Sequence, residues 1–312
     1  MKLSNFWPSL ERVAREEGVA RLGVSDLADA HAALFGEWLD AGHHGTMRYL
    51  AKNREIRADA AARFPWAKSA VVILVPYESA RPDAPPEALT NHIARYAFGD
   101  DYHEVLDRIL RRFEEALAPH ARTWRYVDTG PLSDRALAAQ AGLGWIAKNA
   151  MLLNEQIGSY TFIGTLLTSL ENDIAPAAVA DRCGTCTRCI DACPTHAILS
   201  NRTVASEHCI SYATIEHRGP LPPTLPTLAG YAFGCDICQE VCPWNSDPAP
   251  AHPAFAPRDE YRATPVSDLL RFAQSDFSEL FRRSAIKRAK LEGMRRNAAA
   301  LTEKEGRGML KG

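Results

Sequence analysis

The sequence has no cysteine outside residues 183–242, so disulfide bonds cannot cross-link the rest of the chain. The N-terminal residues also lack the basic start and long apolar run of a secretion signal. We therefore expect a cytoplasmic protein whose thiols stay reduced. No run approaches the ~20 apolar residues of a membrane-spanning helix, and we expect no membrane partner.

The eight cysteines form two runs with one member between them. The first run has the bacterial ferredoxin spacing C-x2-C-x2-C-x3-C-P, in which three cysteines hold one 4Fe-4S cluster and the fourth reaches a second. The second run repeats the last three positions of that motif, with Ala232 where the first cysteine would stand. Cys209 lies between the runs and completes the set of eight that two cubanes require. The runs are Cys183, Cys186, Cys189 and Cys193, and Cys235, Cys238 and Cys242.

The spacing also predicts which thiols share a cluster. Because the fourth cysteine of a ferredoxin run binds the other cluster, we pair the ligands crosswise. Structural zinc and disulfides are the alternatives, but zinc sites favour separated pairs of ligands over an uninterrupted triple. The predicted ligand sets are Cys183, Cys186, Cys189 and Cys242 for one cluster, and Cys193, Cys209, Cys235 and Cys238 for the other.

Residues 1–175 alternate helix and strand signals, which predicts an α/β (α+β) domain with a central mixed sheet. The clearest strand is the unbroken apolar run 69–76, and a helix is expected over 104–117. No Gly-x-Gly-x-x-Gly follows a strand, so a Rossmann nucleotide site has no support. Other strands are expected at 22–24, 123–127, 151–153 and 160–167, and other helices at 4–18, 28–41 and 134–141.

The sequence Ile174-Ala175-Pro176 indicates a boundary, after which we expect a ferredoxin-type domain over 176–250 and a C-terminal helical segment over 251–312. In that segment Ser267 is expected to cap a helix at 268–272, and a second helix is expected at 285–301. Residues 282–296 carry seven Lys or Arg against a single acid, Glu292. Several of these cations should therefore face solvent and could meet a polyanion.

Five stretches carry a likeness to one known family. They are residues 42–47, 57–75, 128–135, 142–149 and the cysteine array, and the likeness extends over about residues 5–300. Together they resemble epoxyqueuosine reductase. The resemblance implies an enzyme that uses a cobalamin and two 4Fe-4S clusters to reduce the epoxide of epoxyqueuosine, in the anticodon loop of tRNA, to the alkene of queuosine. This is the last step of queuosine biosynthesis. Longer members continue into a helical-repeat domain that we expect this short form to lack.

Asp134 is the predicted catalytic residue. It follows a strand and a loop, where active-site residues of α/β folds often lie, and Ser133 before it is a suitable helix cap. From the residues alone, a carboxylate in the first turn of a helix is explained equally well by its favourable interaction with the helix dipole. The resemblance implies that Asp134 is the family's proton donor.

The resemblance also implies contacts to cobalamin. The sequence lacks the Asp-x-His-x-x-Gly signature by which many corrinoid proteins supply a histidine to cobalt. We therefore expect no protein side chain on the lower face of the cobalt. The implied contacts are Arg57, Tyr96, Ala97, Asp134, Gly158, Ser159, Tyr160, Ser211 and Asp236.

Turning an epoxide into an alkene consumes two electrons and two protons, and clusters deliver electrons singly. The resemblance implies tRNA as a partner, and the delivery of single electrons predicts an external one-electron donor such as a flavodoxin or a ferredoxin. The protein is expected to be a monomer. An electron carrier alone would not need an α/β domain of this size. The alternative function is that of a related cytosolic corrinoid iron-sulfur reductase, similar to reductive dehalogenases, acting on a small molecule.

Overall fold

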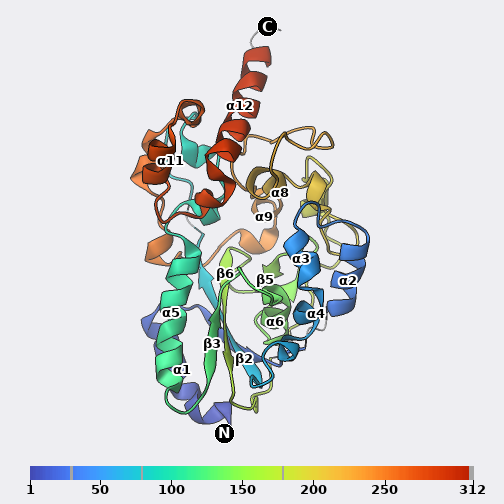
Figure 1. Cartoon of the computed structure of the whole chain (residues 1–312), viewed down its shortest axis with the longest axis vertical. Coiled ribbons are helices and arrows are strands. Elements are labelled where there is room, and N and C mark those ends of the chain that lie inside the picture. The colour runs from blue at the N-terminus through green and yellow to red at the C-terminus, as the bar shows by residue number, and fades with distance from the viewer. Residues whose placement is uncertain (29–30, 79, 178, 309–312) are drawn as a thin grey trace.

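The computed structural model describes residues 1–28, 31–78, 80–177 and 179–308, the last six of these by their backbone alone. The chain has two parts along its long axis, with the two termini at opposite ends (Figure 1). We call residues 1–175 the sheet domain, because they contain all the named strands, which lie toward the N-terminal end; residues 89–98 pack in a core with the C-terminal segment. The cluster region (residues 176–250) and the C-terminal segment (residues 251–308) lie at the other end. No described helix is long and apolar enough to cross a membrane.

A four-stranded sheet with the order β1-β2-β6-β3 organises the sheet domain. All three strand pairs are antiparallel, so the mixed sheet predicted from the sequence is wrong. Every residue of β2 is buried, and such a buried run does not reveal the direction of its neighbours. The strands are β1 (Arg21–Ser25), β2 (Ser69–Pro76), β3 (Thr123–Tyr126) and β6 (Thr161–Thr168), with β4 (Trp145–Ile146) and β5 (Leu152–Leu153) paired separately.

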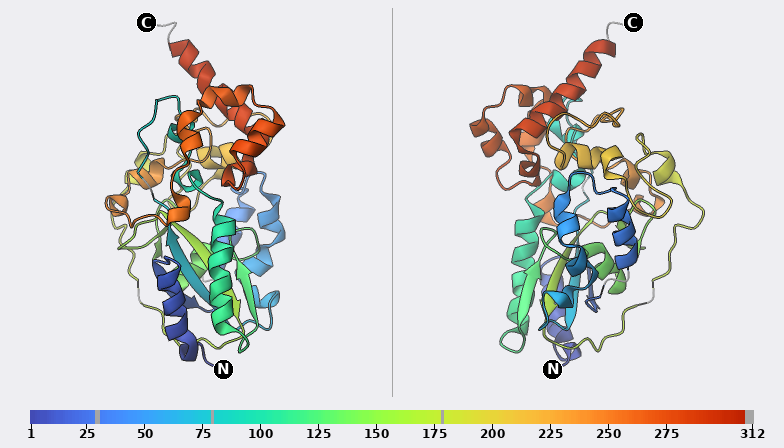
Figure 2. Two further views of the ribbon diagram at one scale, coloured as in Figure 1. Left: turned by 90° about the vertical axis from the view of Figure 1, so that its left-hand side faces the viewer. Right: turned by 45° about the vertical axis from the view of Figure 1, so that its right-hand side comes forward.

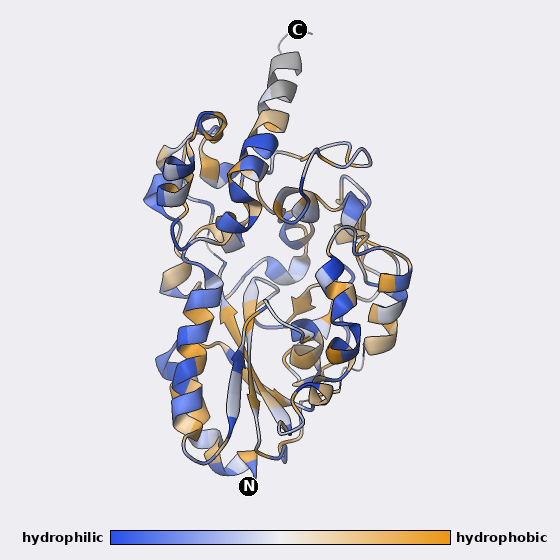
Figure 3. Cartoon of the chain, viewed as in Figure 1, coloured by the Kyte–Doolittle hydropathy of each residue, from blue (hydrophilic) through white to orange (hydrophobic). Residues whose placement is uncertain are grey.

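Helices cover both faces of this sheet (Figure 2). Alternate residues of β2 point to opposite sides: Val71 and Ile73 belong to the core under α1 (Trp7–Glu16) and α5 (Tyr102–Leu117), and Val72 belongs to the core under α6 (Asp134–Gln140). The buried residues of α5 recur every three or four positions, from Val105 to Leu117. Its opposite face is hydrophilic (Figure 3).

The remaining helices are short, except for the last. Among the described residues, six of these α-helices lie in the sheet domain or the cluster region, and the C-terminal segment contributes three. The α-helices are α2 (Ala32–Asp40), α3 (Arg48–Lys52), α4 (Arg54–Ala58), α7 (Arg188–Asp191), α8 (Ile210–Ile215), α9 (Ile237–Glu240), α10 (Asp259–Ala263), α11 (Gln274–Leu280) and α12 (Lys290–Gly308). The 3-10 helices are η1 (Leu3–Phe6), η2 (Ala60–Ala62), η3 (Leu89–Asn91), η4 (Arg95–Ala97), η5 (Ser206–His208), η6 (Pro243–Asn245), η7 (Pro253–Phe255), η8 (Val266–Leu270) and η9 (Ala285–Ala289).

The C-terminal segment does not pack by itself. Its buried Tyr261 and Phe281 share one core with Phe98 of the sheet domain and Phe233 of the cluster region, so this core crosses both predicted domain boundaries. The helix expected at 268–272 is instead η8, preceded by Pro265 and without a side-chain cap from Ser267. The helix expected at 285–301 divides at Lys290, whose φ is 62°, into η9 and α12. Residues 309–312 lie outside the described chain.

The cations of residues 282–296 find more partners than the local sequence offers. Arg283 pairs with Glu104 at 2.7 Å, and Arg288 pairs with Glu216 at 2.7 Å. Arg295 and Arg296 donate to backbone carbonyls, those of Phe272 and Ala213 among them. Acids that are distant in the sequence therefore pair with two of these cations, although Glu292 is the single acid within the stretch. The expectation that several of the cations face solvent is confirmed, because five are exposed: Arg282, Arg283, Lys287, Arg288 and Lys290. Among the seven cations of this described stretch, those whose side chains make no hydrogen bond or ion pair are Arg282, Lys287 and Lys290.

Candidate cluster sites and active site

All eight cysteines are free thiols, and the crosswise prediction divides them into two ligand groups of four. Burial is the main reason why most of their pKa values are raised, and the charges of neighbouring thiolates add to it. In the first group, the charge of Cys242 adds to the raised pKa of Cys189. The charges of Cys183 and Cys186 add in the same way to the raised pKa of Cys242. In the second group, burial raises the pKa of Cys235 to about 12, with additions from Cys209 and Cys193. The pKa of Cys238 is raised by burial and by the charges of Cys235 and Cys209, with a further addition from Cys189 of the first group. The crosswise pairing of ligands stays a prediction.

The surroundings of both groups suit iron-sulfur clusters. Trp145 Nε1–H donates to Cys183 Sγ at 3.4 Å, and the backbone N–H of Ala197 donates to Cys193 Sγ at 3.3 Å. Such donors stabilise thiolate ligands and tune a cluster. Among the described residues, no three His, Cys, Asp or Glu side chains are spaced to hold a single metal ion. The iron-sulfur core of a cubane is larger than a single metal ion, so its four thiolate ligands lie farther apart than the ligands of one ion.

Asp134 begins α6 and follows the loop that leaves β3. Its Oδ1 is buried and has no hydrogen-bond partner, although the residue as a whole is partly exposed. Burial, together with the charge of Asp128, raises the pKa of Asp134 well above the usual aspartate range, and Arg57 opposes this shift. Ser133 does not cap the helix as predicted. Its hydroxyl donates to the carbonyl of Arg57 at 3.3 Å instead.

Arg57 fixes the loop that carries Asp134. From α4, its Nη1 donates to Leu132 O at 2.6 Å and its Nη2 donates to Gly130 O at 2.8 Å, while its Nε is buried without a partner. On the other side of the loop, Tyr126 Oη donates to Asp128 O at 2.7 Å. The loop is thus held from α4 and from β3, which sets the position of the Asp134 carboxyl. The prediction that Arg57 contacts cobalamin stays a prediction.

The sequence analysis assigned no role to a group of three titratable side chains near the loop that carries Asp134. It consists of Asp101 and His103 at the start of α5 and Asp128 in the loop after β3. Burial alone would lower the pKa of His103, but hydrogen bonds and charges from Asp101 and Asp128 outweigh it and raise the pKa to about 9. The available signal in the sequence was the pair of acids, Asp128 and Asp134, within one short block.

Tyr96, Ala97 and Tyr160 lie between the sheet domain and the cluster region. Burial raises the pKa of Tyr96, with additions from Asp128 on one side and from Glu216 and Asp236 on the other. Tyr160 lies under the guanidinium of Arg95, with 5.5 Å from Cζ to the ring centroid. Ala97 is 1% exposed and belongs to the core shared with the C-terminal segment. Cobalamin contacts at these residues stay predictions.

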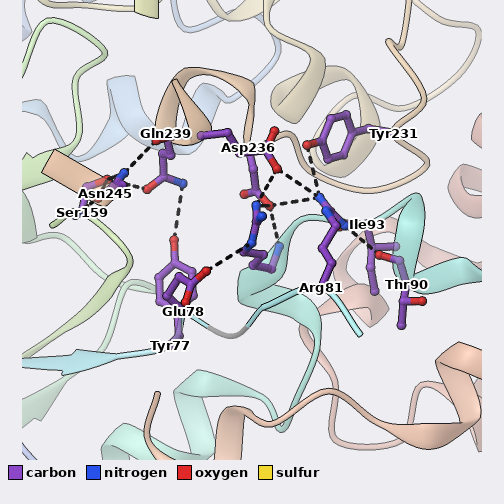
Figure 4. Close-up of polar contacts among 12 residues, drawn as sticks. Tyr77, Glu78, Arg81, Thr90, Ile93, Ser159, Tyr231, Asp236, Gln239 and Asn245 are labelled. Atoms are coloured by element: carbon purple, nitrogen blue, oxygen red, sulfur yellow. Dashed lines mark hydrogen bonds and ion pairs between the residues drawn. The ribbon is translucent and has the colours of Figure 1, made fainter. Parts of the chain in front are cut away.

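A buried polar network joins the end of the sheet to the loop that carries Cys235, Cys238 and Cys242 (Figure 4). Ser159 Oγ donates to Gln239 Oε1 at 2.9 Å, and Asn245 Oδ1 accepts from the backbone N–H of Ser159 at 2.8 Å. A Cβ on Gly158 would lie only 2.2 Å from Asn245 Oδ1, so a glycine is required there. We call the three residues Ser159, Gln239 and Asn245 the seam.

Asp236 belongs to a second polar network, which lies beside the seam in Figure 4. It is 1% exposed, accepts from the backbone N–H of Arg95 at 2.7 Å, and lies 3.5 Å from the guanidinium of Arg81. Burial raises its pKa to about 6, against the hydrogen bond from Arg95. Ser211, in the first turn of α8, follows Cys209. The hydrogen-bonding groups of Ser159 and Asp236 are thus engaged within the protein, and their cobalamin contacts stay predictions.

The fold and the cysteine groups define a class of protein, an oxidoreductase that holds two iron-sulfur clusters against an α/β domain. The family described as "4Fe-4S double cluster binding domain" matches residues 182–245, and the family described as "Epoxyqueuosine reductase QueG" matches residues 57–129. The epoxyqueuosine reductase of Gloeobacter violaceus is 39% identical over 306 residues, which cover 91% of this chain and 92% of that relative. The chain therefore belongs to the epoxyqueuosine reductase family, and it is an oxidoreductase.

Solved structures agree with this assignment. A crystal structure of epoxyqueuosine reductase with an epoxyqueuosine-modified tRNA-Tyr stem loop has a TM-score of 0.85 and 31% identity, and the match covers 95% of this chain and 80% of the other. A structure of the Bacillus subtilis enzyme, with an aspartate-bearing catalytic loop swung out of the active site, has a TM-score of 0.82 and 30% identity at the same coverage.

Proposed function

We propose that the protein reduces the epoxide of epoxyqueuosine in tRNA to the alkene of queuosine, with electrons supplied one at a time through two 4Fe-4S clusters. The substrate follows from the family and from the relative solved with an epoxyqueuosine-modified stem loop. The observation in this chain that carries the proposal is the carboxyl of Asp134, whose Oδ1 is buried without a hydrogen-bond partner and whose pKa is raised by burial well above the usual aspartate range. A relative whose catalytic loop bears an aspartate supports the same role.

The chemistry requires such an acid. Removing the epoxide oxygen breaks two C–O bonds, consumes two electrons and two protons, and releases water. An alkoxide is a poor leaving group in the absence of a proton donor, so a positioned acid lowers the barrier. Asp134 donates a proton to the epoxide oxygen as the first C–O bond breaks. Arg57 and Tyr126 hold the loop so that this carboxyl stays in place.

The residues around Asp134 suit a large polar ligand. Two buried polar atoms have no hydrogen-bond partner: Asp134 Oδ1, at the end of the loop, and Nε of Arg57, which holds that loop. Such atoms normally face a ligand or water. The family resemblance identifies the ligand as cobalamin, which supplies a low-potential cobalt centre that takes single electrons from the clusters. The residues proposed to hold it are Arg57, Tyr96, Ala97, Gly158, Tyr160 and Ser211, with Ser159 and Asp236 as weaker candidates because their polar atoms are already engaged.

Replacement of the acid tests the proposal. Asp134→Asn, reconstituted without oxygen, should retain its cluster and cobalamin spectra but form alkene ~10²–10⁴-fold more slowly. The matched control is Asp259→Asn on α10, where the carboxylate is 92% exposed, and it should turn over like the unaltered protein. Turnover of Asp134→Asn at the control rate would leave Asp134 with its helix-stabilising role alone.

A further inference from the structure

One short segment of the sheet domain reaches the cysteine loops. It comprises residues 145–149, which form β4 and the turn after it. Trp145 Nε1–H donates to Cys183 Sγ at 3.4 Å. Lys148 Nζ donates to two carbonyl oxygens of the loop that follows this cysteine, one of them that of Cys186 at 2.9 Å. An N–H donor to sulfur and an ammonium group therefore both lie against the loop that links two cluster ligands.

This segment is held in place by the sheet domain. Strand β4 pairs with β5, and the side chain of Arg135 on α6 donates to the carbonyl oxygen of Ala150, directly after the segment. Trp145 is 5% exposed, and the apolar cluster around it includes contacts with Cys183 and Trp244. The indole N–H thus meets the sulfur on a side of the loop that is shielded from water.

Trp244 allows a matched comparison with Trp145. The two rings meet edge to face, with 5.5 Å between their centroids and 82° between their planes, and Trp244 packs against the same apolar cluster. No described residue accepts a hydrogen bond from the indole of Trp244, whereas that of Trp145 donates to Cys183. The two tryptophans therefore share their surroundings but differ in the bond to sulfur.

We infer that Trp145 and Lys148 raise the reduction potential of the cluster bound by Cys183. A reduced cluster carries one more negative charge than an oxidised one, so an N–H donor to a ligand sulfur and a nearby cation stabilise the reduced form more. The cluster then accepts its electron from a weaker one-electron donor. The inference rests on the clusters and goes beyond the proposed function, which concerns the substrate and the acid.

Two pairs of substitutions test the two groups separately. Trp145→Phe keeps an aromatic ring in the apolar cluster but removes the N–H donor, so the midpoint potential should fall. Trp244→Phe removes an indole that has no bond to sulfur and should leave the potential unchanged. Lys148→Met removes the cation and should also lower the potential. Lys148→Arg keeps a positive charge and should stay close to the unaltered protein.

The measurement is electron paramagnetic resonance of the reconstituted protein, without tRNA, at a series of controlled potentials. The signal of the relevant cluster is identified by its change in Cys183→Ser. Iron content and circular dichroism verify that each variant is folded and holds both clusters. The charge-matched control is Lys68→Met, because Lys68 pairs with Glu171 beside the N-terminus, and its loss should not move the potential.

An unchanged potential in Trp145→Phe or Lys148→Met, with iron retained, or equal shifts in Trp145→Phe and Trp244→Phe, would overturn the inference. If Trp145→Phe does not retain its clusters, the difference between Lys148→Met and Lys148→Arg decides, and equal potentials in that pair would refute it. These readouts involve no turnover. Shifted potentials together with normal turnover of Asp134→Asn would leave the inference standing and refute the proposed function.

Discussion

The sheet domain and the cluster region hold their structure by different means. Strand β2 has eight buried residues in register with β6, and α5 has 16 residues with one buried face. In the cluster region, α7 and α9 have four residues each and α8 has six, which is too short for a helix to be stable by itself. Apolar burial stabilises the first part, whereas the second needs its metal ligands, as small metal-binding domains do.

The largest difference between the two parts should appear when one cysteine thiol is removed. Cys209→Ser should lower the iron content from about eight to about four per chain, because a cubane that loses a ligand is lost as a whole. The sheet domain should keep its circular dichroism, since none of its strands depends on Cys209. Iron analysis and visible spectra measure the effect, and Glu207→Gln, an exposed neighbour, is the control. Unchanged iron in Cys209→Ser would refute the crosswise ligand sets.

A cavity in the sheet core should instead destabilise the sheet domain and leave the clusters bound. Leu74 of β2 is 0% exposed, and Leu74→Ala should lower the free energy of unfolding by about 2–5 kcal/mol. The clusters should remain bound under native conditions. Urea unfolding followed by circular dichroism measures the loss, with Leu270→Ala, at a site that is 40% exposed, as the control. Equal costs for the two variants would mean that apolar burial does not stabilise the sheet domain as proposed.

The seam should transmit a smaller effect between the two parts. Gln239→Leu removes the acceptor at Gln239 Oε1 from Ser159 Oγ, which keeps its contact with Asn245 Nδ2, and it removes the hydrogen bond to Tyr77 Oη. A buried polar group without a partner costs about 1–3 kcal/mol. We expect faster iron loss to a chelator and a lower free energy of unfolding. Gln274→Leu, on the exposed side of α11, should change neither. The two parts would be independent if iron loss from Gln239→Leu proceeded at the unaltered rate.

The smallest effect should come from the cations that lack partners within the protein. If Arg282, Lys287 and Lys290 meet tRNA phosphates, each reversal to Glu should reduce the slope of log affinity against log salt by ~0.7–0.9. Turnover at saturating tRNA should stay the same, because phosphate contacts position the substrate. Filter binding at several salt concentrations measures the slope. The control pair is Arg12→Glu and Arg15→Glu on α1, near the other end of the molecule. Identical slopes in all variants would place the RNA on another surface.

Local patterns predicted the elements of the sheet domain well. The apolar run 69–76 became β2 with the same bounds, and Asp134 does begin a helix, as expected. Patterns spanning a few residues could not reveal partners from distant parts of the chain. Arg288 pairs with Glu216, 72 positions away, so counting acids near the basic stretch was misleading. The antiparallel sheet likewise depends on how strands meet, which a single buried run does not encode.

For the site, the cysteine spacing carried most of the information because ligand geometry fixes it. The group of Asp101, His103 and Asp128 was not predictable, since it forms where the start of α5 meets the loop after β3. The cobalamin contact that the resemblance implies at Asp236 stays a prediction. The sequence did not reveal that its carboxylate is also paired with Arg95 and Arg81, which come from a distant part of the chain.

The seam has a consequence for how the protein withstands air. Because Ser159 is bonded to both Gln239 and Asn245, disorder in the cysteine loop would disturb the turn that begins β6. Coupling between two binding sites is reciprocal. If bound clusters strengthen the binding of a ligand at residues 158–160, that ligand strengthens iron retention by the same free energy. We expect the protein to lose iron to oxygen more slowly when that turn is occupied, and a ligand that binds there without slowing the loss would show that the coupling is absent.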